Sequence, residues 1–408
     1  AYNGIISTDS RAWKYPEKWY KNGIYEEVHD RLCQEFMACQ QVSLLAWMKE
    51  HHKEVYDNIQ YAFSVKDYIR YRLTGEAYSE ATDISGSGLM NVRDARFDRD
   101  ILEKLEIGEV YDMLPPIRYS CDLCGTITKE AAQLTGLLEG TKVAGGMFDI
   151  DACAVAVDIT SPERMCTIAG TWSINEYISE RPVMDGSIAM NSLFAIPGYY
   201  LVEECSATSS GNLEWYLEQC MENEKVPEGE SIYSIVNEKV ASVKPEESDV
   251  YFLPFLYGSN AHPLGKGAFV GLTTYHEKAH MLRAIYEGVV FSHKTHIEKL
   301  LVSRKPPEAI RMAGGAVNSK EWVQMFADIL GFPIETVDAK ELGALGCGMA
   351  AAIAAGVYKD YKEAAEHMVH VSGRVEPNPE MHEIYQRKYE KYRAVSRALD
   401  TVWEQFEV

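Results

Sequence analysis

One arrangement recurs along this sequence: an apolar run of β-strand type leads into a turn built on glycine. The glycine turns lie at 145–146, 170–171 and 314–315. The stretch 310–338 is the most complete example, because it predicts a strand, a glycine turn, a helix that stops at Gly331, and a second strand. Strands that alternate with helices in this way favour an α/β fold. The 408 residues suffice for two or three domains with a substantial core.

Two carboxylates stand in an unusually apolar part of the first of these segments, GGMFDIDACAVAV at 145–157. A charge in such surroundings is costly unless it gains a partner or a function. Asp149 and Asp151 are therefore both candidate functional residues. Residues 142–149 predict a short buried strand that turns on the glycines, and the small residues of 150–159 allow close packing. Spacing alone does not choose between the two aspartates.

Other parts of the chain have clear helical patterns. The predicted helices are 43–55, 65–76 with a stop at Gly75, 276–301 with one buried face, 341–356 made almost wholly of Gly and Ala, and a long helix beginning near Pro377. Residues 79–92 are rich in Ser, Thr and Gly, so a loop is expected there. Such a loop is either a plain connection or a carrier of polar contacts to a ligand.

Charge and cysteine content narrow the class of protein. The formal net charge of −21 argues against nucleic acid or an anionic membrane as a partner. No apolar run approaches a membrane span, and the first residues do not form a signal peptide. The nine cysteines fit free thiols in the cytoplasm, and the lone C-x-x-C at Cys121 and Cys124 is too little for a zinc or redox site. His293 and His296 lack an evident third metal ligand, so a packed or solvated pair is expected.

A glycine turn ahead of a helix N-terminus is a structure that can hold phosphate through backbone N–H groups. The turn at 314–315 precedes a good helix, which either Asn318 or Ser319 is placed to cap. The sequence contains neither a P-loop motif nor a dinucleotide-binding glycine motif. The glycines therefore indicate a phosphorylated ligand only in a general way.

Four ordered segments resemble the FGGY family of carbohydrate kinases. They are GAFVGLTTYHEKAHMLRAIYE at 267–287, GGAVNSKEWVQMFADILGFPIE at 314–335, GTW at 170–172, and the aspartate segment at 145–157. The resemblance implies a two-domain ribonuclease H-like α/β fold of the actin and hexokinase type, with the active site in the cleft between the domains. It implies a sugar-binding domain I over 1–158 and a nucleotide-binding domain II over 159–408. The family's N-terminal Asp-Gly-Thr-type turn is not found, so domain I is expected to lack its N-terminal part.

The same resemblance assigns roles to individual residues. It places Asp149 as the catalytic base, in contact with Mg²⁺ through water, and makes Asp151 a substrate contact or a capping charge. It matches Asp9 and Arg11 to a polar pair near the sugar. The expected ATP-binding residues are Gly170 and Thr171 for the β- and γ-phosphates, Gly211 near the nucleotide, Gly314 and Gly315 under the α-phosphate and adenosine, and Ser319 near the adenine.

The expected function is ATP-dependent phosphorylation of a terminal hydroxyl of a ketose. The longer stretches 3–12, 207–219, 251–261 and 285–297 resemble the branch of the family that acts on L-xylulose and 3-keto-L-gulonate. One alternative is a kinase for another pentulose, a polyol or a sugar acid. A different class is a sugar-binding regulator that kept the fold and lost catalysis. The oligomeric state is left open, with a homodimer among the options.

Overall fold

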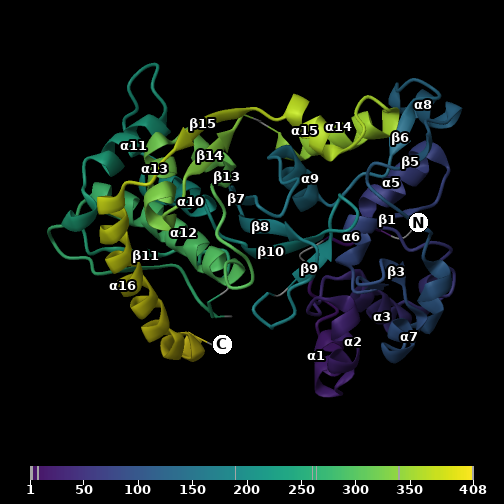
Figure 1. The fold of residues 1–408 in the computed structure, drawn as a ribbon. Helices are drawn as coiled ribbons and strands as arrows, with labels where there is room; N and C mark the ends of the chain where they lie inside the picture. The colour runs from purple at the N-terminus through teal and green to yellow at the C-terminus, as the bar shows by residue number, and fades with distance from the viewer. Residues whose placement is uncertain are drawn as a thin grey trace. The chain divides into compact units, whose positions relative to one another are not determined.

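The computed structural model describes residues 3–6, 9–188, 190–259, 261–262, 264–338 and 341–406. Residues 7, 8 and 260 of the resembling stretches lie outside this description. The chain forms two compact units, and it passes repeatedly from one to the other (Figure 1). Unit 1 comprises Ala1–Pro162, Ile178–Val202 and Ala339–Val369; unit 2 comprises Glu163–Tyr177, Glu203–Asp338 and His370–Val408.

Unit 1 is mainly helical. Its helices are α1 (Lys14–Lys21), α2 (Ile24–Leu32), α3 (Gln41–His51), α4 (Lys53–Tyr56), α5 (Val65–Thr74), α6 (Ala81–Ser85), α7 (Arg99–Lys104), the 3₁₀ helix η1 (Gly108–Met113), α8 (Lys129–Thr135), α9 (Asp149–Ala156), α14 (Leu342–Ala355) and α15 (Tyr361–Met368). The predicted stop after α5 is confirmed, because Gly75 adopts the left-handed conformation at φ 78°. The first helices enclose an apolar core in which Trp19 packs against Phe36 with ring centroids 4.8 Å apart.

The strands of unit 1 are short. Parallel β1 (Ser79–Glu80) and β4 (Ile117–Arg118) form one pair, and β2 (Met90–Asn91) with β3 (Arg96–Phe97) and β5 (Leu123–Thr126) with β6 (Lys142–Ala144) form antiparallel pairs; β9 (Met190–Leu193) follows later. The prediction of a buried strand before the first glycine turn is correct in type but wrong in burial, because β6 is only partly covered. Lys142 is exposed, whereas Val143 and Ala144 are partly buried.

The expected loop at 79–92 is wrong in large part. The segment contains β1, helix α6 and β2, and most of its residues are buried. The carboxylate of Glu80 caps α6 by accepting hydrogen bonds from the N–H groups of Thr82 and Asp83 at 3.0 and 3.3 Å. Several of the polar side chains that indicated a loop are hydrogen-bonded inside the unit, Thr82 to the Glu80 carboxylate and Ser85 and Ser87 to backbone carbonyl oxygens, which reduces the cost of burying them.

Unit 2 is built on a sheet whose strands run in the order β15-β14-β13-β7-β8-β10. They are β7 (Met165–Ala169), β8 (Ser173–Ser179), β10 (Tyr200–Ser206), β13 (Ile310–Ala313), β14 (Ile334–Val337) and β15 (Val371–Val375). β13 is parallel to both β7 and β14, whereas β8 is antiparallel to β7 and β15 to β14. The predicted strand–turn–strand at 164–179 and the predicted order of elements over 310–338 are confirmed.

The remaining elements of unit 2 are mostly helices. They are α10 (Gly211–Cys220), α11 (Ile232–Ala241), η2 (Pro245–Glu247), the antiparallel strands β11 (Tyr251–Leu253) and β12 (Ala268–Val270), α12 (Lys278–Leu300), η3 (Gly315–Asn318), α13 (Lys320–Leu330), α16 (Pro379–Trp403) and η4 (Glu404–Phe406). The prediction of one buried face for α12 is wrong, because polar positions such as Arg283 and Glu287 are buried too. Those two side chains form an ion pair at 2.8 Å, so each buried charge has a partner of opposite sign.

Candidate active site

Two of the three glycine turns lie side by side in unit 2. Strands β7 and β13 are parallel neighbours, with Ala313 opposite Ile168, so the turns that follow them leave the same edge of the sheet. A Cβ placed on Gly314 would lie 2.6 Å from the carbonyl oxygen of Ala169 and 3.0 Å from the nitrogen of Gly170. Gly314 also has φ 94°, which favours glycine. The 314–315 turn therefore touches the 170–171 turn directly.

The beginning of α10 joins the same place. Both the backbone N–H and the hydroxyl of Ser210 donate to the carbonyl oxygen of Gly170, at 2.9 and 2.6 Å. A Cβ on the next residue, Gly211, would lie 3.9 Å from Thr171. The structure thus brings together five of the residues singled out in the sequence: Gly170, Thr171, Gly211, Gly314 and Gly315.

The open side of this cluster suits a phosphorylated ligand. A Cβ on Gly170 or on Gly315 would meet nothing within 4 Å, and Thr171 and Gly315 are exposed. The N-terminus of α10 adds a partial positive charge there. Backbone N–H groups can bind phosphate oxygens without lysine, so the acidic character of the chain does not oppose such a ligand.

Ser319 has a structural role at the start of α13. Its hydroxyl accepts a hydrogen bond from the N–H of Trp322 at 3.1 Å and donates to the Asn237 side chain at 2.8 Å. It is the helix cap that the sequence had left between Asn318 and Ser319. The residue is 7% exposed, and the expected contact with adenine stays a prediction.

His293 is fully buried and connects β7, β8 and the segment before α10. Its Nδ1 is 2.9 Å from Thr167 Oγ1 on β7 and 3.1 Å from Ser173 Oγ on β8. Its Nε2 is 3.0 Å from Ser209 Oγ, just before α10. Burial lowers the pKa of His293 well below its usual value, so the ring is neutral near pH 7.

The packed alternative for the histidine pair is confirmed, since His296 is buried as well, 3.2 Å from the Glu204 carboxylate. Among the described residues there is no group of three or more His, Cys, Asp or Glu side chains that could hold a metal ion. Cys121 and Cys124 are free thiols. Among the residues that the structure describes, no helix is long and apolar enough to cross a membrane.

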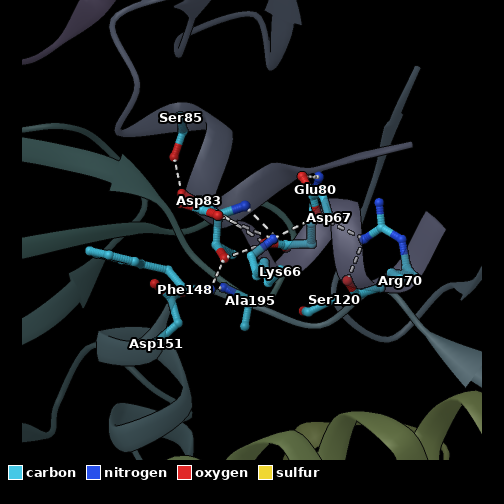
Figure 2. Close-up of polar contacts among 12 residues, drawn as sticks. Lys66, Asp67, Arg70, Glu80, Asp83, Ser85, Ser120, Phe148, Asp151 and Ala195 are labelled. Atoms are coloured by element: carbon cyan, nitrogen blue, oxygen red, sulfur yellow. Dashed lines mark hydrogen bonds and ion pairs between the residues drawn. The ribbon is translucent and has the colours of Figure 1, made fainter. Parts of the chain in front are cut away.

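Asp149 and Asp151 have opposite environments in unit 1. Asp149 is the first residue of α9 and is exposed, with its Oδ1 accepting from the N–H of Ile150 at 3.1 Å. Asp151 is fully buried, and its Oδ1 accepts from the N–H of Ala195 at 2.8 Å (Figure 2). The charge of Asp149 is favoured by the helix dipole and can reach a ligand. Asp151 instead ties α9 to the chain after β9.

The predicted close packing of the Gly- and Ala-rich helix is found against α9. Figure 1 shows α14 beside α9, although the two lie far apart in the sequence. A Cβ on Gly346 would lie 2.7 Å from the carbonyl carbon of Ala152 and 2.8 Å from its Cα. The position of Asp149 therefore depends on small residues in both helices.

Asp9, which is half-buried, and the exposed Arg11 form an ion pair in unit 1. The Nε of Arg11 lies 2.9 Å from each carboxylate oxygen of Asp9, and its guanidinium lies over the ring of Trp47. The hydrogen bond from the Arg11 side chain lowers the pKa of Asp9. Arg11 lines a hollow together with Trp47, Glu50 and His51. A role of this pair toward a sugar stays a prediction.

Sequence reasoning missed a cluster of buried charges next to α9. Lys66 Nζ lies 2.9 Å from Asp67, 3.3 Å from Glu80 and 3.4 Å from Asp83 (Figure 2). Arg70 pairs with Asp67 at 2.9 Å. Lys66, Asp67 and Arg70 lie on the predicted helix 65–76, whereas Glu80 and Asp83 lie in the stretch 79–92 that was expected to be a loop. No local signal in the sequence brings the two segments together.

Comparisons with known proteins place this chain in a family. The N-terminal domain of the FGGY family of carbohydrate kinases matches residues 1–156, and the C-terminal domain of that family matches 165–355. The L-xylulose/3-keto-L-gulonate kinase of Escherichia coli (strain K12) is 37% identical over 399 residues, which are 97% of this chain and 78% of that protein. A probable L-xylulose kinase of Pasteurella multocida (strain Pm70) is 35% identical over 397 residues, 97% of this chain and 79% of that protein.

A solved structure supports the same fold. The ligand-bound xylulose kinase from Lactobacillus acidophilus aligns with a TM-score of 0.89 at 24% identity, covering 100% of this chain and 81% of that one. This likeness confirms the expected two-domain α/β architecture of the actin and hexokinase type. With both domains of the family matched and a relative 37% identical along almost the whole chain, the protein belongs to the FGGY family of carbohydrate kinases and is a phosphotransferase that acts on a sugar.

Proposed function

We propose that this protein transfers the γ-phosphate of ATP to a terminal hydroxyl of a ketose, with L-xylulose as the first candidate and 3-keto-L-gulonate as the second. The observation that carries the proposal is the contrast within GGMFDIDACAVAV: Asp149 is exposed at a helix N-terminus, whereas Asp151 is buried. The choice of sugar rests on the two relatives named above, which are 37% and 35% identical to this chain.

Unit 2 supplies the residues for the nucleotide. The turns at Gly170–Thr171 and Gly314–Gly315 and the start of α10 offer backbone N–H groups and one exposed hydroxyl on an open side. These groups suit the phosphates of ATP, and we assign the β- and γ-phosphates to Gly170 and Thr171. Gly211, Gly314 and Gly315 would lie along the rest of the nucleotide, with Ser319 toward the adenine.

We assign residues 1–158 to the sugar-binding domain and residues 159–408 to the nucleotide-binding domain, and Asp149 in the first of these acts on the acceptor hydroxyl. Asp149 accepts the proton of the sugar hydroxyl as that oxygen bonds to the γ-phosphorus, and the bond from this phosphorus to the bridging oxygen breaks, so that ADP leaves. Mg²⁺ offsets the negative charge of the phosphates, and it needs only one or two protein carboxylates besides those oxygens. One exposed carboxylate at Asp149 fits that requirement. Asp9 and Arg11 are proposed to lie near the sugar, and Asp151 to hold α9 in place.

The test is a coupled assay of ADP release with the full chain, ATP and Mg²⁺ across a panel of sugars. We expect turnover with L-xylulose or 3-keto-L-gulonate above that with other pentuloses, polyols and sugar acids. Asp149→Asn should abolish turnover and leave ATP binding nearly unchanged. Asp100→Asn is the matched control, because Asp100 is also an exposed aspartate in the first turn of a helix. Asp100→Asn should lower the free energy of unfolding by at most about 1 kcal/mol and leave turnover unchanged.

Two results would refute the proposal. A near-normal kcat in Asp149→Asn would show that this carboxylate is not the base. The absence of turnover with every sugar, together with retained sugar binding, would instead support a regulator of the same fold.

A further inference from the structure

A short chain of hydrogen bonds links the buried charges of unit 1 to the residue that precedes Asp149. The backbone N–H of Phe148 donates to Thr82 Oγ1 at 2.8 Å, and that hydroxyl donates to Glu80 Oε2 at 2.7 Å. Phe148 is the N-cap of α9. Figure 2 shows Glu80 beside Asp67, with Phe148 on the left of the view beyond Lys66. The hydroxyl of Thr82 is thus the link between a buried carboxylate and the backbone that carries Asp149.

Glu80 is itself held in one orientation. It is fully buried, its carboxylate lies 3.3 Å from Lys66 Nζ, and its backbone N–H donates to Asp67 at 3.1 Å. Burial raises the pKa of Glu80, and the positive charge of Lys66 opposes that shift. Buried ion pairs of this kind add little net stability, because desolvation offsets their attraction. What such a pair can supply is a fixed geometry.

The other end of the same turn is fixed from the same cluster. Arg70 Nη1 donates to the carbonyl oxygen of Gly145 at 2.5 Å, while its guanidinium pairs with Asp67. A Cβ on Gly146 would lie 3.9 Å from the Lys66 side chain, so this part of the turn lies over Lys66. The backbone from Gly145 to Phe148 is therefore held at one end by Arg70 and at the other by Thr82, both of which belong to one hydrogen-bonded cluster.

We infer that Thr82 and Glu80 are positioning residues for phosphoryl transfer: they set the direction in which α9 begins and hence where the carboxylate of Asp149 points. The inference rests on the proposed role of Asp149 as the base. A displacement of a catalytic group by about 1 Å can lower the rate about 100-fold. Among the described residues, the hydrogen bond that the structure shows on the Asp149 side chain comes from the N–H of Ile150, the next residue of α9, so the direction of the side chain follows the start of the helix.

Thr82→Val tests the inference, because valine keeps the shape and removes the hydroxyl. We expect kcat to fall about 10- to 100-fold while the KM for ATP changes less than about twofold. Thr82→Ser should restore most of kcat. Thr74→Val is the matched control: the Thr74 hydroxyl is also buried in unit 1, donates to a carbonyl oxygen and accepts from a backbone N–H, but it does not touch the turn. Glu80→Gln is a second variant should Thr82→Val fail to fold.

One further measurement separates positioning from simple loss of stability. Hydrogen exchange of a peptide covering 145–152 should become faster in Thr82→Val and not in Thr74→Val, and this readout does not depend on kinase activity. Equal kcat values for the two valine variants, or unchanged exchange at 145–152, would overturn the inference. If the unmodified protein lacks all kinase activity, the proposed function is refuted instead. The exchange experiment would still show whether the Thr82 hydroxyl holds the backbone of 145–152.

Discussion

Gly346→Ala is the substitution whose effect the packing of unit 1 defines best. The added Cβ would lie 2.7 Å from the carbonyl carbon and 2.8 Å from the Cα of Ala152, and closest of all to its carbonyl oxygen. These are backbone atoms of α9, so no side chain can rotate away and the two helices must separate. Overpacking costs about 1–3 kcal/mol, and a backbone clash belongs at the upper end. Replacing a glycine inside a helix by alanine stabilises the helix by about 1 kcal/mol, which offsets part of this cost.

The expected result is a net loss of about 2 kcal/mol in the free energy of unfolding, equivalent to a melting temperature lower by about 4–8 °C. Thermal unfolding followed by circular dichroism would measure it. Gly348→Ala is the control, because it lies in the same helix and its Cβ would meet only the end of the Met368 side chain at 3.9 Å. That variant should be about 0.5–1 kcal/mol more stable. If both variants shift in the same direction, α9 and α14 do not pack as described.

Two further predictions concern unit 2. Gly314→Ala introduces a side chain at φ 94°, 2.6 Å from the carbonyl oxygen of Ala169, so the KM for ATP should rise about tenfold through backbone strain of about 1–3 kcal/mol; an unchanged KM would contradict the placement of the nucleotide. Burial lowers the pKa of His293 and of His296 in the folded state, so the unfolded state binds more protons at acid pH. The free energy of unfolding should therefore fall below about pH 6.5 by up to about 1.4 kcal/mol per pH unit for each histidine, and chemical unfolding of His293→Gln between pH 7 and 5 should give a shallower fall. If the free energy of unfolding of the variant falls equally steeply with pH, His293 does not contribute to the loss of stability in acid.

The segments that the sequence predicted best are those in which the signal is local. The strand, glycine turn and helix over 310–338 were predictable because apolar periodicity, a capping serine and the stop at Gly331 all lie within one stretch of chain. The stretch 79–92 was mispredicted, because its Ser, Thr and Gly content is typical of a loop. What makes it β1, α6 and β2 is the burial of Glu80 and Thr82 against Lys66 and Phe148, which are distant in sequence.

The amino-acid sequence alone determined the α/β class, the family resemblance and the two candidate aspartates, because glycine turns, small-residue helices and ordered motifs are properties of short segments. Only the tertiary structure decided which aspartate faces solvent, that the turns at 170–171 and 314–315 touch, and that Thr82 of α6 accepts a hydrogen bond from the N-cap of α9. The physical reason is that burial, ion pairing and backbone approach depend on residues that are brought together only when the chain folds. Asp149 and Asp151 show this most simply, since two residues of one type in one helical turn end in opposite environments.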